Sequence, residues 1–386
     1  MPDGFTNTGI ERLRAVAESH VGDDLVPGLV AMVARGEHVH VEALGNLTIG
    51  GPPVRRDSLF RIASTTKPIT AAATLALVDE GLLEIEEPVE RLLPELADRQ
   101  VLVCMEGPLE DTVPARRPIT VRDLLTFTFG FGMATGMFYA SAPWPVMEAA
   151  AARGVRTAGP PPADELDPDT WMTALGTLPL LAQPGERWLY NTGGSVLGIL
   201  CARAAGAPFP DVLSGRIFEP LNMPDTAFWT TGTDRLATAY QPTPEGLVVH
   251  DGPTGAWARP PVFPDGAGGL LSTVDDLLAF GRMLLSDGAP VLSAGSAQAM
   301  RTDQLTPEQK AKGGLGPNFF ASMSWSFGQA VHHDGTFGWD GGLGTTWRVD
   351  PRHDLIMIVL TQRMWERADP PQVHKDIQAA AYAALE

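Results

Sequence analysis

The 386-residue sequence is poor in cysteine, in lysine and in long apolar runs. Its two cysteines, Cys104 and Cys201, lie far apart and match no metal-binding spacing, so we expect two reduced, buried thiols rather than a disulfide or a zinc site. No apolar run reaches about eighteen residues, and the first residues have neither the basic nor the apolar segment of a secretory signal. We therefore expect a cytoplasmic protein without a membrane partner.

Positive charge is also scarce. The sequence has 28 Lys and Arg against 46 Asp and Glu, a formal net charge of -18. Because nucleic-acid affinity depends largely on cationic side chains that neutralise phosphates, this balance argues against a nucleic-acid partner. The sequence contains no His-Glu-x-x-His motif and no strand-turn-helix phosphate loop, so we expect no metal and no cofactor.

The apolar pattern predicts strands near both ends of the chain and helices between them. Residues 28–45 are typical of a β-hairpin, and residues 344–363 of two strands joined by a turn. Helices are expected over residues 8–20, 64–80 and 370–385, and the second of these is apolar on nearly every side, as a buried helix would be.

These elements predict one domain over residues 1–386, of the α/β (α+β) class. The two ends of the chain, about 1–75 and 265–386, would form an α/β subdomain around one sheet. The segment between them, about 76–264, mixes helical stretches with proline-rich loops and would form a mainly helical subdomain. The oligomeric state stays open.

The rarity of lysine makes the lysine at position 67 informative. Only four lysines occur among the 28 basic residues, the other 24 being arginines. Ser64 and Lys67 lie three residues apart at the start of a predicted helix, so both side chains project from one face. A serine becomes a useful nucleophile when a neighbour removes its proton, which a desolvated lysine can do and an arginine cannot. The alternative is that Ser64 only caps the helix, and the pair alone is weak evidence.

The segment with this pair and four further segments carry recognisable motifs: "FRIASTTK" (60–67), "ITVRDLLTFTFGFG" (119–132), "PGERWLYNTGGSVLG" (184–198), "GAGGLLSTVDDLLAFGRMLL" (266–285) and "FGWDGGLGTTWRVDP" (337–351). Together they resemble the serine β-lactamase-like hydrolases: class C β-lactamases, D-alanyl-D-alanine carboxypeptidases and, closest, family VIII carboxylesterases. The resemblance covers nearly the whole chain and implies a β-lactamase/transpeptidase-like fold, with an antiparallel sheet flanked by helices and an inserted mainly helical subdomain.

The resemblance also implies roles for individual residues. Ser64 would be the nucleophile, Lys67 its partner and Tyr190 the group that shuttles the proton. The oxyanion hole would consist of the backbone N–H groups of Ser64 and Gly342. An adjacent Lys67 ammonium would lower the pKa of Tyr190. Which of Lys67 and Tyr190 is the resting base stays open, because coupled groups titrate as a unit.

Two departures from the family pattern bear on the substrate. Where relatives have Tyr-x-Asn, this sequence has Tyr190, Asn191 and Thr192, so the usual amide is missing. Where relatives begin the third motif with lysine or histidine, it has Trp339, Asp340 and Gly341, as in the Trp-x-Gly of family VIII esterases.

A substrate carboxylate would find no cation at the third motif, and Asp340 would repel it further if it faced the cleft. We assign Trp339 and Gly341 to substrate binding, although a tryptophan can also be only an apolar wall. The aromatic stretch "FTFGFGMATGMFYASAPW" (127–144) either lines an acyl pocket or belongs to the ordinary core.

The predicted function is that of a serine carboxylesterase. It would hydrolyse small, neutral, short-acyl esters through an acyl-enzyme, with a small-molecule ester as its substrate. The alternatives are a β-lactamase, a D-amino-acid peptidase or amidase, or an acyltransferase with the same Ser-Lys-Tyr residues. An α/β-hydrolase is disfavoured, because the sequence has no Gly-x-Ser-x-Gly motif.

Overall fold

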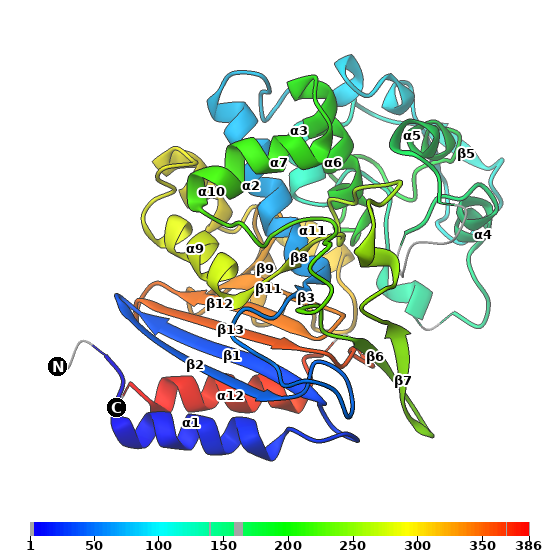
Figure 1. The fold of residues 1–386 in the computed structure, drawn as a ribbon. Coiled ribbons are helices and arrows are strands. Elements are labelled where there is room, and N and C mark those ends of the chain that lie inside the picture. Colours follow the sequence, from blue (N-terminus) through cyan, green and yellow to red (C-terminus); the bar gives the residue numbers. More distant parts are fainter. Residues whose placement is uncertain (1–3, 139, 158–164, 368, 386) are drawn as a thin grey trace.

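A seven-stranded antiparallel sheet separates two layers of helices in the computed structural model, which describes residues 4–138, 140–157, 165–367 and 369–385 (Figure 1). The strand order is β2-β1-β13-β12-β11-β10-β9. The strands are β1 (Gly28–Arg35), β2 (His38–Gly45), β9 (Met323–Trp325), β10 (Ala330–His332), β11 (Phe337–Gly341), β12 (Thr345–Asp350) and β13 (Leu355–Thr361).

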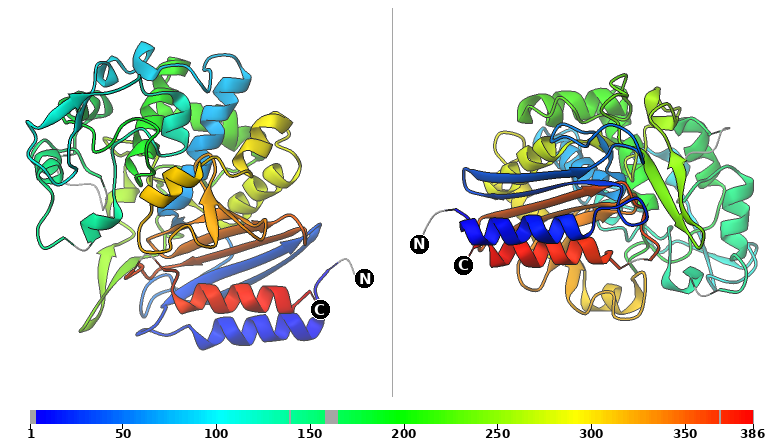
Figure 2. Two further views of the ribbon diagram at one scale, coloured as in Figure 1. Left: turned by 180° about the vertical axis from the view of Figure 1, so that it is seen from behind. Right: turned by 60° about the horizontal axis from the view of Figure 1, so that its bottom comes forward.

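Two terminal helices cover one face of the sheet, and the remaining helices lie over the other. Helix α1 (Asn7–Ser19) packs beside α12 (Gln372–Ala383), although nearly the whole chain separates them (Figure 2). The other helices are α2 (Thr66–Asp79), α3 (Val121–Leu125), α4 (Pro145–Ala152), α5 (Pro168–Gly176), α6 (Thr192–Ala205), α7 (Phe209–Leu213), α8 (Glu219–Leu221), α9 (Val274–Leu285), α10 (Ala294–Met300) and α11 (Pro307–Lys312).

Three short two-stranded ribbons complete the described structure. They pair β3 (Phe60–Arg61) with β8 (Leu271–Ser272), β4 (Gln100–Leu102) with β5 (Thr112–Pro114), and β6 (Ala239–Thr243) with β7 (Gly246–Asp251). The first ribbon matters most for the site, because it joins the segment before Ser64 to the segment after residue 269.

The predicted fold class and its principal elements are confirmed. The expected hairpin, the two C-terminal strands and the helices over residues 8–20, 64–80 and 370–385 all form within a few residues of their predicted bounds. The division into an α/β and a helical subdomain stays a prediction. The strands of the large sheet do come from residues 28–45 and 323–361, near the two ends of the chain.

Helix α2 forms the centre of the helical layer. Nearly all its side chains are buried, and it packs against α6. A helix that is apolar on every side is stable only where protein surrounds it. Gly81, with φ 75°, ends the helix and donates its N–H to the carbonyl of Val78. The rigid surroundings of α2 fix the position of any group in its first turn.

One prediction about cysteine is wrong. Cys201 is buried on α6, but Cys104 is exposed, because it lies in the loop after the short strand β4. Both thiols are free.

Among the described residues, no single helix is long and apolar enough to cross a membrane. One bent pair, Thr192–Ala205 with Phe209–Leu221, has the required length and composition when taken together, and residues of both belong to the hydrophobic core.

Candidate active site

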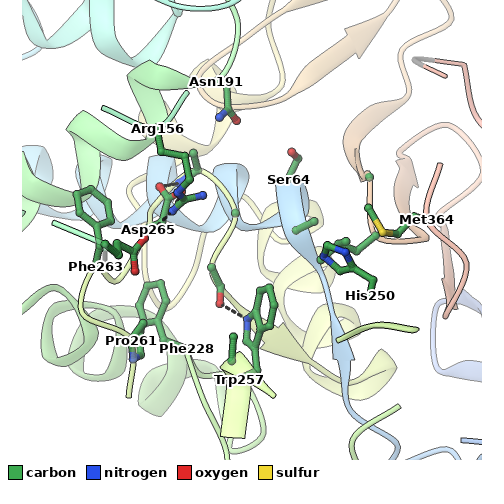
Figure 3. Close-up of a pocket in the computed structure, with 18 of the residues that line it drawn as sticks. Ser64, Arg156, Asn191, Phe228, His250, Trp257, Pro261, Phe263, Asp265 and Met364 are labelled. Atoms are coloured by element: carbon green, nitrogen blue, oxygen red, sulfur yellow. Dashed lines mark hydrogen bonds and ion pairs between the residues drawn. The ribbon is translucent and has the colours of Figure 1, made fainter. Parts of the chain in front are cut away.

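Ser64 lies in a strained turn at the start of the central helix. It belongs to the short 3-10 helix Ala63–Thr65, which runs directly into α2, and it lines the main cavity (Figure 3). Ala63, immediately before it, has φ 44°, a left-handed conformation that a residue with a Cβ rarely adopts. Such strain persists only where the surrounding structure imposes it, and it concentrates at functional sites.

Lys67 is buried and in contact with Ser64. Its side chain is 1% exposed, and its Nζ lies 2.8 Å from Ser64 Oγ and donates to the carbonyl of Ala267 at 2.5 Å. Burial lowers the pKa of Lys67 to about 7, against the opposing attraction of Asp265. Near neutral pH the amine is therefore available in its neutral form, which can accept a proton from Ser64.

Tyr190 lies beside Lys67 and Ser64, in the turn that leads into α6. Lys67 Nζ is 4.7 Å from the centre of its ring. Burial raises the pKa of Tyr190 above its usual value, although hydrogen bonding with Ser64 and Trp339 acts in the opposite direction. The expectation that Lys67 lowers this pKa is thus wrong, because desolvation of the phenolate outweighs its stabilising contacts. Tyr190 is a neutral phenol that can donate a proton.

Four buried aromatic side chains surround the Tyr190 ring. Trp188 stacks on it with ring centroids 5.4 Å apart, and Trp325 meets it edge-on at 6.4 Å. Phe127 packs against it at 6.1 Å and Trp339 at 5.8 Å. These contacts fix the position of the phenol.

Trp339 also holds the Tyr190 hydroxyl directly. Its indole Nε1–H donates to Tyr190 Oη at 2.8 Å. Trp339 is 7% exposed and is not among the residues that line the main cavity in the described part of the chain. Its direct contact with substrate stays a prediction, whereas its contact with Tyr190 gives it a place in the site that the sequence did not suggest.

Gly341 and Gly342 connect strand β11 with the turn that carries Ser64. A Cβ at Gly341 would lie 2.2 Å from both the carbonyl oxygen of Ile62 and Thr345 Oγ1, so only glycine allows this approach. Thr345 Oγ1 donates to the Ile62 carbonyl at 3.1 Å and ties β12 to the same turn. As a result, Gly342 lines the cavity together with Ser64.

Asp340 does not line the cavity. Its carboxylate is paired with Arg348 at 2.6 Å, and both side chains are about 10% exposed. Successive residues of a strand point to opposite faces, so Asp340 lies behind the sheet when Trp339 points toward Tyr190. The charge of Asp340 is thus compensated by Arg348 and does not face a bound substrate.

The cavity has a volume of about 320 Å³ and a largely apolar wall. Half of the lining residues come from segments that the sequence did not single out, among them Phe228, His250, Trp257, Pro261, Phe263 and Met364 (Figure 3). Arg156, Glu165 and Asp265 form a charged cluster in it, with Arg156 Nη2 3.0 Å from Glu165 and 3.5 Å from Asp265. Only Asp265 had a sequence signal, since it directly precedes the glycine-rich segment at 266–269.

The aromatic stretch after residue 126 belongs mostly to the core. Phe127, Phe129, Phe131 and Trp144 are buried and do not line the cavity, whereas Met133, alone among the described side chains of this stretch, does. The side chain of residue 138 and all of residue 139 lie outside the described part of the structure.

Asn191 lines the cavity next to Tyr190 but is held elsewhere by its amide. It has φ 80°, and its Nδ2 donates to the carbonyl of Thr157 at 2.6 Å. Asn191 therefore does not take the place of the asparagine in the Tyr-x-Asn motif of relatives, because its amide is bonded to Thr157.

Comparison with known proteins agrees with this fold. The family model described as Beta-lactamase matches residues 13–381. The chain is a member of the β-lactamase family. Protein Rv1367c of Mycobacterium tuberculosis is 40% identical to it over 88% of this chain and 86% of that protein. Esterase EstB of Burkholderia gladioli is 31% identical over 93% and 92%.

A solved structure shares the fold of this β-lactamase-family chain. "EstCE1, a hydrolase with promiscuous acyltransferase activity" superposes with a TM-score of 0.83, at 24% identity, covering 97% of this chain and 99% of that one. Family membership and the esterase relative show that this protein is a serine hydrolase of the β-lactamase-like superfamily, close to the family VIII esterases. Among the described residues, no group of three or more His, Cys, Asp or Glu could hold a metal ion.

Proposed function

We propose that this serine hydrolase is a carboxylesterase for small, neutral esters, with Ser64, Lys67 and Tyr190 as its catalytic residues. The observation that carries the proposal is the buried Lys67 amine, 2.8 Å from Ser64 Oγ at the cavity wall, with its pKa lowered to about 7. A lysine in this state is a base at neutral pH, and the adjacent hydroxyl is the group it can deprotonate.

Acylation follows from these positions. Lys67 in its neutral form takes the proton of Ser64 while Oγ attacks the ester carbonyl. The backbone N–H groups of Ser64 and Gly342 stabilise the oxyanion. Tyr190 gives its phenolic proton to the departing alkoxide and recovers a proton from the Lys67 ammonium. The alcohol leaves, and the acyl group stays on Ser64 as an ester.

Deacylation reverses the proton path. Water attacks the acyl-enzyme carbonyl and transfers a proton through Tyr190 to Lys67, and Ser64 recovers its proton as the acid leaves. The resting base is Lys67 rather than Tyr190, because burial favours the neutral form of both groups: the neutral lysine accepts protons and the neutral phenol donates them.

The cavity supports a neutral, modest-sized substrate. A volume of about 320 Å³ is at the lower end of the range for small-molecule sites. Phe228, Trp257 and Phe263 offer apolar contacts. Arg156 carries the positive charge in the wall, but it is paired with both Glu165 and Asp265, so the cluster has no net positive charge to attract a carboxylate. The name of the EstB relative, an esterase, agrees with this choice.

The test is a comparison of initial rates on p-nitrophenyl acetate, butyrate and octanoate and on a chromogenic cephalosporin. The wild type should cleave the short esters far faster than the lactam. Ser64→Ala and Lys67→Ala should lower ester kcat/KM by about 10³-fold or more. Lys375→Ala, which removes an exposed lysine on α12, is the matched control and should retain wild-type activity.

Three results would contradict the proposal. Preference for the lactam would indicate an amide hydrolase, full activity of Ser64→Ala would remove the proposed nucleophile, and the best rate on octanoate would remove the short-acyl preference. Adding a primary alcohol and measuring the transfer product separates an esterase from an acyltransferase, since EstCE1 is described as having promiscuous acyltransferase activity beside hydrolysis.

A further inference from the structure

A turn at residues 265–269 holds Lys67 and Thr70 of α2 through its backbone carbonyls. The carbonyl of Ala267 accepts from Lys67 Nζ at 2.5 Å, and the carbonyl of Gly266 accepts from Thr70 Oγ1, one helical turn further along α2, at 2.8 Å. The position of this turn therefore decides where the Lys67 amine lies.

Asp265 organises the turn with both its backbone and its side chain. Its carbonyl accepts from the N–H groups of Gly268 and Gly269 at 3.2 and 2.9 Å. Its Oδ1 accepts from the N–H of Ala267 at 2.8 Å and from Ser195 Oγ at 2.7 Å. Asp265 is 8% exposed. A buried carboxylate with these partners is rigid.

Ser195 connects this carboxylate to the Tyr190 side of the site. It lies in the first turn of α6, which begins two residues after Tyr190. The α6 backbone approaches the turn so closely that a Cβ on Gly266 would lie 2.6 Å from the carbonyl oxygen of Gly194. One carboxylate is thus bonded to the turn that holds Lys67 and to the helix that follows Tyr190.

We propose that Asp265 is a positioning residue for the catalytic pair: it holds the Ala267 carbonyl against Lys67 Nζ, places its own negative charge near that amine, and fixes Lys67 relative to Tyr190 through Ser195. The inference rests on the proposed function, since it assigns Asp265 a role only if Lys67 is the base.

The charges around Lys67 make Asp265 the group with the largest influence. Ser64 and Tyr190 face the amine but are neutral, and the attraction of Asp265 is what opposes the lowering of the Lys67 pKa by burial. Arg156 and Glu165 face Asp265 from the cavity wall. The elements packed against α2 carry further charged groups, and most of them are paired: Asp340 with Arg348, Arg216 with Glu80, and Arg203 of α6 with Glu95 and Asp169. Asp211 of α7 is exposed, and Asp79, at the far end of α2, accepts from Ser293 and Ser296.

Asp265→Asn separates charge from geometry. The amide oxygen can still accept from Ser195 and Ala267, so the turn is retained while the negative charge is lost. Without that charge the ammonium form of Lys67 is less stable, so the acidic limb of kcat/KM should move to lower pH by about one unit. The plateau should fall about threefold, because the weaker base accepts a proton less readily.

Ser195→Ala tests the geometric part and stays informative if Asp265→Asn does not fold. It keeps the charge but removes the 2.7 Å hydrogen bond. We expect kcat to fall about three- to tenfold, with KM and the pH of the acidic limb unchanged. Asp123→Asn is the control: this carboxylate is 3% exposed, caps α3, pairs with Arg117 and does not line the cavity. It should lower the melting temperature without moving the limb.

The outcomes are distinguishable. The inference fails if the acidic limb of kcat/KM in Asp265→Asn lies at the same pH as in the wild type. If Asp265→Asn does not fold, the inference fails when Ser195→Ala has the kcat of the wild type. In both cases the proposed function stands as long as Ser64→Ala and Lys67→Ala are inactive. If either of those two variants retains full activity, the proposed function itself fails.

Discussion

The pH dependence of ester hydrolysis is the most direct consequence of the buried lysine. Burial moves the pKa of Lys67 from 10.5 to about 7, and only the neutral amine can take the proton of Ser64. The pKa of Tyr190 is raised above its usual value of 10.0, so this group stays protonated across the working range. The activity should therefore have a single acidic limb, set by Lys67.

The magnitude follows from the fraction of neutral lysine. With a pKa of about 7, roughly half of the enzyme is active at pH 7, about a tenth at pH 6 and about a hundredth at pH 5. The value of kcat/KM should thus fall about tenfold for each pH unit below the midpoint, and it should be flat from about pH 8 to pH 9.

The assay is the initial rate on p-nitrophenyl butyrate from pH 5 to 9 at constant ionic strength, corrected for spontaneous hydrolysis. Circular dichroism at each pH excludes unfolding as the cause of lost activity. A profile that is flat from pH 5 to 8 would refute the reasoning and would indicate a base that titrates below this range, as a carboxylate does. A rate that still rises about tenfold per pH unit up to pH 9 would indicate a lysine with an unperturbed pKa.

Three further outcomes follow from the same geometry. Trp339→Phe keeps the packing against Tyr190 but removes the 2.8 Å hydrogen bond, so kcat should fall about tenfold while the melting temperature changes by a few degrees at most; an unchanged kcat would mean that the indole N–H does not position the phenol. Gly341→Ala places a Cβ 2.2 Å from the Ile62 carbonyl, so it should lower both thermal stability and activity, whereas wild-type values for both would show that β11 can move away. Lys67→Met removes a buried group whose folded pKa, about 7, lies below its unfolded value of about 10.4. In the wild type, the unfolded state binds more protons than the folded state between these two pKa values, so Lys67 should raise the free energy of unfolding by about 2 kcal/mol from pH 7 to 9. The variant should lack this rise. Denaturant titrations at both pH values measure the free energy of unfolding, and an equal rise in the wild type and the variant would contradict the shifted pKa.

Local patterns in the sequence were sufficient to predict that Ser64 and Lys67 lie side by side. The 3.6-residue period of a helix places Ser64 and Lys67 on one face, and the structure has Nζ within 2.8 Å of Oγ. The same kind of reasoning located α1, α2, α12 and the strands of both chain ends, because apolar periodicity and glycine or proline boundaries act within a few residues.

Half of the residues that line the cavity could not be predicted in this way. Arg156, Phe228, His250 and Met364 come from four separate segments, and only packing brings them to one wall. For the stretch after residue 126 the sequence favoured neither an acyl pocket nor the ordinary core, and the structure buries Phe129 and Phe131 fully in the core. Apolar composition alone does not distinguish a cavity wall from a core, since both exclude water.

The sequence by itself determined the family, the fold class and the residue types available for acyl transfer: a rare lysine three residues after a serine, a tyrosine before a helix, and glycines where two backbones meet. Only the tertiary structure decided what those groups can do. Burial, not spacing, lowers the pKa of Lys67 and raises that of Tyr190. Asp340 does not line the cavity, because it points to the other face of strand β11 from Trp339, and its charge is paired with Arg348. Desolvation and direction depend on atoms that surround a residue in space, and most of those atoms are distant from it in the chain.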